Sequence, residues 1–162
     1  MKRFVRDHLR YVDEIQCAAA RIVEAMKEKV WMNSDNQVDF FDTFHVQRGD
    51  FKVNKTLLSA DELYYNIEDI MTPQSTLYIA TDEKNWSYFA PFYRRHHVYF
   101  LSNFEHLVAG LNTNYYGLVE QLVVAQGRLF VGCMFSTFSG FVTRIRGYKS
   151  THARQVTGVP KW

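Results

Sequence analysis

Apolar residues recur at every third or fourth position near the start of the chain, which predicts one long amphipathic helix over residues 5–30. Four later runs are almost continuously apolar and rich in β-branched or aromatic residues. They predict buried strands near 38–46, 76–81, 97–101 and 128–132. Amphipathic segments between and after them predict helices over 59–71, 86–94, 102 onwards, 114–126 and 137–147. This alternation predicts an α/β fold with one parallel sheet covered by helices.

Local signals support this order. Ser59 and Glu62 have the spacing of a capping box, and Pro73 ends the helix that follows it. Ser102 is expected to cap another helix. We find no repeat and no Pro/Gly-rich linker, so residues 1–150 are expected to form one domain, followed by a polar C-terminal tail over 151–162.

Composition narrows the function classes. The net charge of +2 over 162 residues is too small to indicate a nucleic-acid partner or an anionic membrane surface. No run reaches the roughly 20 apolar residues of a membrane span, and the charged N-terminus does not look like a signal peptide. We expect Cys17 and Cys133 to be two thiols rather than a disulfide.

Because ligands bind beyond the carboxyl ends of parallel strands, the residues after each strand are the candidate site. The first predicted strand ends in His45, Gln47, Arg48 and Gly49. The Arg48 guanidinium could bind a phosphate or diphosphate through two N–H groups, and Gly49 would let the backbone approach it. The alternative is a structural turn in which Arg48 pairs with Asp50.

The last strand ends in a turn rich in hydroxyl groups. Ser136, Thr137 and Ser139 lie where this strand meets a helix, and hydroxyls with free N–H groups at a helix start bind anions. The alternative is an ordinary Ser/Thr helix cap. In the preceding helix, the Glu120 carboxylate could accept hydrogen bonds from a base such as guanine, or it could lie on a solvated helix face.

Other polar residues carry weaker signals. Asp82 and Glu83 follow a strand and could line the cleft, but a cap for the next helix is the better interpretation. His96 and His97 are adjacent and so face different ways, which argues against a metal pair. We predict no metal site.

Four segments in order carry a resemblance: FHVQRGDF (44–51), LYIATDE (77–83), VEQLVVAQGRLFVG (119–132) and FSTFSGFVTRIRGY (135–148). Together they resemble the GDP-fucose protein O-fucosyltransferase family, over roughly residues 5–148. Related fucosyltransferases share the first motif as His-x-Arg-Arg. The resemblance implies a Rossmann-like sheet similar to the C-terminal, nucleotide-sugar-binding lobe of a GT-B glycosyltransferase.

The resemblance also implies roles and partners. Arg48 would be the catalytic cation, and the substrate-binding residues would be His45, Gln47, Glu120, Ser136, Thr137 and Phe138. The donor would be GDP-fucose with no cofactor and no metal, and the acceptor a protein Ser or Thr hydroxyl. The family suggests the lumen of the endoplasmic reticulum or Golgi, although no signal or membrane segment is found.

Two departures from the family pattern affect the activity. The first motif arginine, which the family places on the β-phosphate, is Gln47 here, so only Arg48 remains. The N-terminal lobe that lines the acceptor cleft is also missing, so we expect a fragment or an incomplete enzyme. Three hypotheses follow: an inverting O-fucosyltransferase, a nucleotide-sugar-binding lobe without catalysis, and a phosphate-binding enzyme of unrelated chemistry on a similar sheet.

Overall fold

The computed structural model describes residues 11–33, 40–49, 58–133, 135–149 and 155–157. The α-helices are α2 (Asp13–Asn33), α3 (Ala60–Tyr65), α4 (Ala90–Tyr93), α5 (Tyr116–Val124) and α6 (Thr137–Lys149). The strands are β1 (Asp42–Val46), β2 (Thr76–Thr81), β3 (His97–Tyr99), β4 (Phe130–Gly132) and β5 (Gln155–Thr157). Short 3₁₀ helices are η1 (Glu68–Ile70), η2 (Trp86–Phe89), η3 (Leu101–Leu107) and η4 (Thr113–Tyr115).

The described strands form one parallel sheet in the order β3-β2-β1-β4-β5, as the alternation of strands and helices predicts. The chain winds outward from β1 to β2 and β3, then returns to the other side of β1 and continues through β4 to β5. The order therefore reverses between β1 and β4. In open α/β sheets this reversal leaves a crevice at the carboxyl ends of the two central strands.

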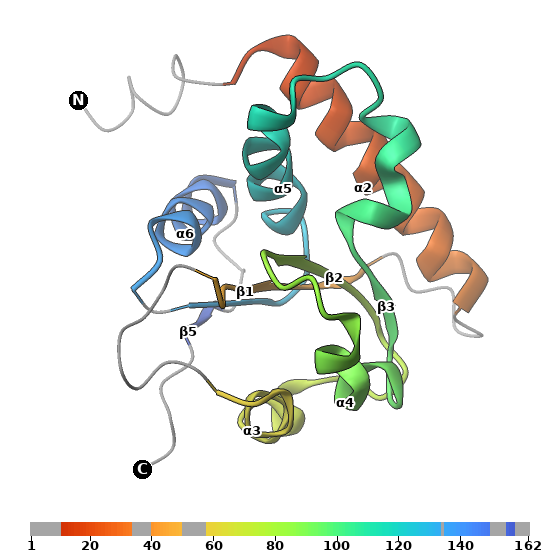
Figure 1. The fold of residues 1–162 in the computed structure, drawn as a ribbon, viewed down its shortest axis with the longest axis vertical. Helices are drawn as coiled ribbons and strands as arrows, with labels where there is room; N and C mark the ends of the chain where they lie inside the picture. Colours follow the sequence, from red (N-terminus) through yellow and green to blue (C-terminus); the bar gives the residue numbers. More distant parts are fainter. Residues whose placement is uncertain (1–10, 34–39, 50–57, 134, 150–154, 158–162) are drawn as a thin grey trace.

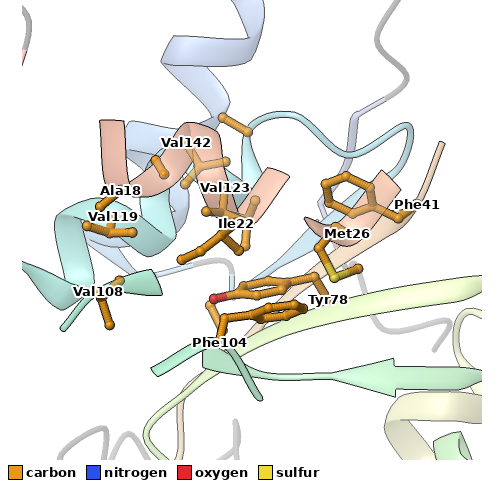
Figure 2. Packing of buried hydrophobic residues seen from close by; sticks show 14 of the residues in the cluster. Ala18, Ile22, Met26, Phe41, Tyr78, Phe104, Val108, Val119, Val123 and Val142 are labelled. Atoms are coloured by element: carbon orange, nitrogen blue, oxygen red, sulfur yellow. The ribbon is translucent and has the colours of Figure 1, made fainter. Parts of the chain in front are cut away.

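Helices cover both faces of the sheet (Figure 1), because residues of each strand alternate between the faces. On one face, α2 and α5 pack over Tyr78, Ala80 and Phe130. Figure 2 shows Ile22 and Met26 of α2 packed near Tyr78, whose ring stacks on Phe104 with centroids 6.3 Å apart. On the other face, α3 and α4 enclose a second core, whose buried members include Phe44, Val46, Ala60, Tyr64, Leu77, Ile79, Phe89, Phe92 and Val131.

Most predicted elements are confirmed, several of them with different bounds. The four predicted strands correspond to β1 to β4, and the helix expected over 5–30 is observed from Asp13 to Asn33, its first residues lying outside the described part. The capping box of α3 is confirmed, since the Ser59 Oγ accepts from the Glu62 N–H at 3.2 Å and the Glu62 carboxylate accepts from the Ser59 N–H at 2.8 Å. Within the described residues, no helix has the length and apolarity needed to cross a bilayer.

One expectation is wrong, and one strand was not predicted. Ser102 does not begin its helix, because η3 starts at Leu101 and the Asn103 side chain accepts from the Phe100 N–H at 2.8 Å. The polar tail expected from residue 151 contains β5, which pairs with β4 from Gln155 to Thr157. A strand at the edge of a sheet gains only one row of hydrogen bonds and needs no apolar run, so the apolar pattern did not predict it.

Candidate nucleotide-binding site

Residues from the carboxyl ends of β1 and β4 and from the start of α6 come together where the strand order reverses. Phe44 and Val46 face the α3 and α4 side, so His45 points to the opposite face, toward α6. There its Nδ1 atom lies 2.8 Å from the Ser139 Oγ, and its ring stacks on the Phe138 ring with centroids 4.1 Å apart and planes 17° apart. Two consecutive residues of α6 thus hold the imidazole in place.

Ser139 also ties α6 to the end of β4. Its Oγ accepts from the Cys133 N–H at 3.0 Å, while the Cys133 thiol donates to the His45 carbonyl at 3.3 Å. Gly132 permits this close approach, because a Cβ there would lie 2.6 Å from the Ser139 Oγ. The strand ends and the helix start form one connected hydrogen-bonded junction.

Burial sets the protonation of this junction. It lowers the pKa of His45 to about 4, although the nearby Asp82 charge acts in the opposite direction, so the imidazole is neutral at neutral pH. Its Nδ1 is engaged with the Ser139 hydroxyl, so Nε2 is the ring nitrogen that this contact does not use. Burial and the Asp82 charge raise the pKa of Cys133, against a hydrogen bond from the Gln47 backbone. Cys133 is therefore a thiol and not an activated nucleophile.

Arg48 belongs to the other side of the sheet. Its guanidinium lies 4.0 Å from the centre of the Tyr88 ring, and its Nε is 3.4 Å from the Glu83 carboxylate. Ser136 and Thr137 lie after β4 and at the start of α6. Both turns are at the carboxyl edge, as expected, but the structure records no contact between Arg48 and Ser136. That both residues contact one diphosphate stays a prediction.

Glu120 lies in α5, inside the layer of helices. The Tyr78 hydroxyl of β2 donates to its carboxylate at 3.4 Å, and burial raises the pKa of Glu120 to about 8. The alternative of a solvated helix face is wrong, because Glu120 is partly buried against the sheet. The structure records no contact between Glu120 and the His45–Ser139 junction, so its role as a guanine reader stays a prediction.

The remaining expected residues divide by exposure. Ser136 is buried, Thr137 is exposed, and Phe138 and Gln47 are partly buried. Ser136, directly before α6, and Thr137, its first residue, therefore offer one covered and one open hydroxyl next to the stacked rings of His45 and Phe138. No contact is recorded for the Gln47 side chain.

Sequence reasoning missed three contributors. Ser139 was grouped with the hydroxyl turn but not as the partner of His45, and Gly132 was not singled out. Asp82 was assigned to cap the next helix, but Asn85 caps η2 by accepting from the Ser87 N–H at 3.2 Å. Asp82 instead accepts from the backbone N–H groups of Arg48 and Gly49. The one available signal was topological: β1 and β2 are neighbours, so the turns at their ends should meet.

The fold and this junction define a Rossmann-like α/β protein with a polar, hydrogen-bonded junction at the point where its strand order reverses. Among the described residues, no group of three side chains has the arrangement of a metal site. The family model for GDP-fucose protein O-fucosyltransferase matches residues 1–149, and the chain belongs to this family.

Two solved structures are similar to the chain, and both are described as POFUT1 in complex with GDP. One, in crystal form III, has a TM-score of 0.47 at 14% identity, over 86% of this chain and 47% of that one. The other, a high-resolution data set, has a TM-score of 0.48 at 15% identity, over 93% and 49%. The chain thus spans about half the length of these structures. The comparison with curated protein sequences found no match.

Proposed function

We propose that the chain binds GDP-fucose in the crevice between β1 and β4 and serves the transfer of fucose to a protein Ser or Thr hydroxyl. The observation that carries the proposal is the junction of His45, Phe138 and Ser139 at the strand-order reversal, in a chain of the O-fucosyltransferase family. The junction combines a fixed neutral imidazole with the free N–H groups of a helix start, which suits an uncharged base edge and an anionic phosphate.

The diphosphate and the base would be bound by different elements. The first turn of α6, with the hydroxyls of Ser136 and Thr137, offers N–H and O–H donors to the phosphate oxygens. Glu120 would read guanine, because an ionised carboxylate accepts from both the ring N–H and the exocyclic amine, a donor pair that adenine does not present. Since its pKa is about 8, Glu120 is mostly protonated in the free protein at neutral pH and must lose its proton to accept both bonds.

In the transfer step, the acceptor oxygen attacks the anomeric carbon of fucose with inversion, the bond from that carbon to the phosphate oxygen breaks, GDP leaves, and the hydroxyl proton passes to water or to the leaving phosphate. Negative charge then grows on the diphosphate and is best stabilised by a cation. Gln47 brings no charge, and Arg48 is engaged with Glu83 and Tyr88. This favours the second candidate function, a nucleotide-sugar-binding lobe that does not catalyse transfer by itself. The N-terminal lobe of the family would supply the rest of the acceptor cleft.

Titration calorimetry with GDP and ADP tests the binding proposal. We expect GDP to bind more tightly than ADP, and Glu120→Gln to lose this preference while keeping its affinity for ADP. The matched control is Glu105→Gln, an exposed glutamate of η3, which should keep the preference. Equal binding of GDP and ADP by the unchanged chain would overturn the assignment of Glu120.

The pKa of Glu120 adds a second readout. Because binding requires the ionised carboxylate, the affinity for GDP should rise by up to about tenfold per pH unit from pH 6 to about 8, then level off. ADP carries the same diphosphate and controls for phosphate ionisation, so the ratio of the two affinities isolates Glu120. In Glu120→Gln the ratio should not change with pH. An assay for GDP-fucose-dependent transfer then separates a working enzyme from a binding lobe.

A further inference from the structure

The turn after β1 holds a carboxylate between two consecutive backbone N–H groups. The Arg48 N–H donates to the Asp82 Oδ1 at 2.7 Å, and the Gly49 N–H donates to the Asp82 Oδ2 at 2.8 Å. Both oxygens of one carboxylate are thus bound by adjacent peptide units. Asp82 comes from the end of β2, the strand next to β1, so the contact joins the carboxyl ends of two neighbouring strands.

Paired backbone N–H groups of this kind form a concave site for an anion. A phosphate group presents two oxygens at a spacing similar to that of a carboxylate, and it can carry more charge. Gly49 keeps the site open, because a Cβ there would come within 2.8 Å of the Asp82 Oδ2. Gly49 and Asp82 are both exposed, so an anion can approach from solvent and the Asp82 side chain has room to turn away.

The site lies on the edge where the nucleotide is proposed to bind. The charge of Asp82 opposes the burial that lowers the pKa of His45 and adds to the burial that raises the pKa of Cys133, so this carboxylate lies within electrostatic reach of the junction. A diphosphate lying against α6 would therefore meet a fixed negative charge on the β2 side. If the Asp82 side chain turned away into solvent, this repulsion would be removed and the N–H groups of Arg48 and Gly49 would be free to bind the phosphate.

We propose that the N–H groups of Arg48 and Gly49 form a phosphate-binding site, and that the Asp82 carboxylate occupies it until a phosphorylated ligand displaces it. The proposal rests on the proposed function for the nucleotide part of the ligand, but the site itself recognises only phosphate oxygens. Asp82 then acts as an internal competitor that weakens the binding of every phosphorylated ligand.

The expected size follows from the competition. If the carboxylate holds the two N–H groups nine-tenths of the time, the apparent affinity for phosphate is about tenfold below the intrinsic affinity. Asp82→Asn removes the charge and most of the competition, so it should bind inorganic pyrophosphate up to about tenfold more tightly at low salt.

Glu105→Gln is the control. It removes one exposed negative charge from η3, but it leaves the two N–H groups occupied by Asp82 and the Arg48 Nε beside Glu83. Calorimetry with pyrophosphate should show a gain of less than threefold for Glu105→Gln. Equal gains in the two variants would mean that Asp82 acts only through the net charge of the protein and would overturn the proposal, as would weaker binding in Asp82→Asn.

The unchanged full chain gives a test that does not depend on a variant folding. Titration with pyrophosphate, followed by nuclear magnetic resonance, should shift the amide signals of Arg48 and Gly49 together with the carboxyl carbon of Asp82. Shifts confined to α6 would contradict the site. Pyrophosphate shifts without any preference for GDP over ADP would leave this site standing and remove the guanine assignment. A preference for GDP, with no shift of the Arg48 and Gly49 amide signals, would support the guanine assignment and overturn this phosphate site.

Discussion

The two ends of the β1–β4 pair are built in opposite ways. At the amino end, Asp42 is 1% exposed and its carboxylate accepts from the Arg128 Nε at 2.9 Å, the Arg128 Nη2 at 2.6 Å and the Leu129 N–H at 3.2 Å. At the carboxyl end, His45 is neutral and the junction with Cys133 and Ser139 has no ion pair. The amino end is held by a buried ion pair, whereas the carboxyl end is held by hydrogen bonds between neutral groups.

This difference separates stability from binding. A two-bonded ion pair satisfies its own donors and acceptors, so it fixes the strands and offers little to a ligand. The carboxyl end uses its hydrogen bonds to orient an imidazole and a helix start, at the edge of the sheet where ligands of open α/β folds bind. We therefore expect substitutions at the amino end to change unfolding, and substitutions at the carboxyl end to change ligand binding as well.

The largest expected effect is that of Asp42→Ala. It leaves the Leu129 N–H without its acceptor and the Arg128 guanidinium without its counter-ion. Because the Arg128 side chain is 37% exposed and can regain water, we expect a loss at the low end for a broken buried pair, about 3 kcal/mol of unfolding free energy in urea.

The control for Asp42→Ala is Glu24→Ala, which breaks the exposed pair between Glu24 and Lys27. It should cost about 0.5 kcal/mol or less. Folded Asp42→Ala should bind GDP within twofold of the unchanged chain. A loss of stability no larger than in the control, or a marked loss of GDP binding, would contradict the division between the two ends.

Gly132→Ala should have the next largest effect. The added Cβ would lie 2.6 Å from the Ser139 Oγ and 2.9 Å from the Phe130 ring, so α6 must move away from β4. We expect a cost of about 2 kcal/mol, accompanied by weaker GDP binding because His45 loses its partner. Gly140→Ala in α6 is the matched control: its Cβ meets nothing within 4 Å, so the variant should be neutral or slightly more stable. If Gly132→Ala lost stability but bound GDP normally, the junction would be structural only.

Much of the fold could be predicted from the sequence because its signals are local. The apolar runs mark β1 to β4, and the Ser59 capping box marks the start of α3. The carboxyl edge also followed from the alternation of strands and helices. The strand β5 could not be predicted in this way, since its place depends on an edge of β4 that exists only in the folded sheet.

The candidate site was predicted less completely, because its contacts join residues far apart in the sequence. His45 and Ser139 each look like ordinary turn residues, and only the sheet order brings them within 2.8 Å. The roles of Arg48 and Asp82 depend on where side chains and backbone N–H groups point, which a sequence motif does not specify. The Arg48 side chain lies on the Tyr88 ring, while the Arg48 N–H donates to Asp82. Motifs identified the segments, and the geometry assigned the partners.

The smallest expected effect concerns the pH dependence of stability. The pKa of His45 is about 4 in the folded chain and 6.5 when exposed, so between these values the unfolded chain binds a proton that the folded chain does not. Stability from this group is complete above pH 6.5 and is lost as the pH falls toward 4. Between pH 6.5 and 5 the loss should be on the order of 1 kcal/mol, measured by urea unfolding of the chain against His45→Gln.

His96 gives the control at the opposite edge of the sheet. Burial also lowers the pKa of His96, which lies between Tyr64 and Ser75, so His96→Gln should remove a part of the same slope. Saturating GDP separates the two histidines. A diphosphate next to His45 favours the charged imidazole and raises the pKa of His45. The contribution of His45 to the loss of stability at low pH should therefore become smaller, whereas the contribution of His96 should not change. If GDP altered both parts equally, or neither, the nucleotide would not bind beside His45, and the two edges would no longer differ in the way proposed.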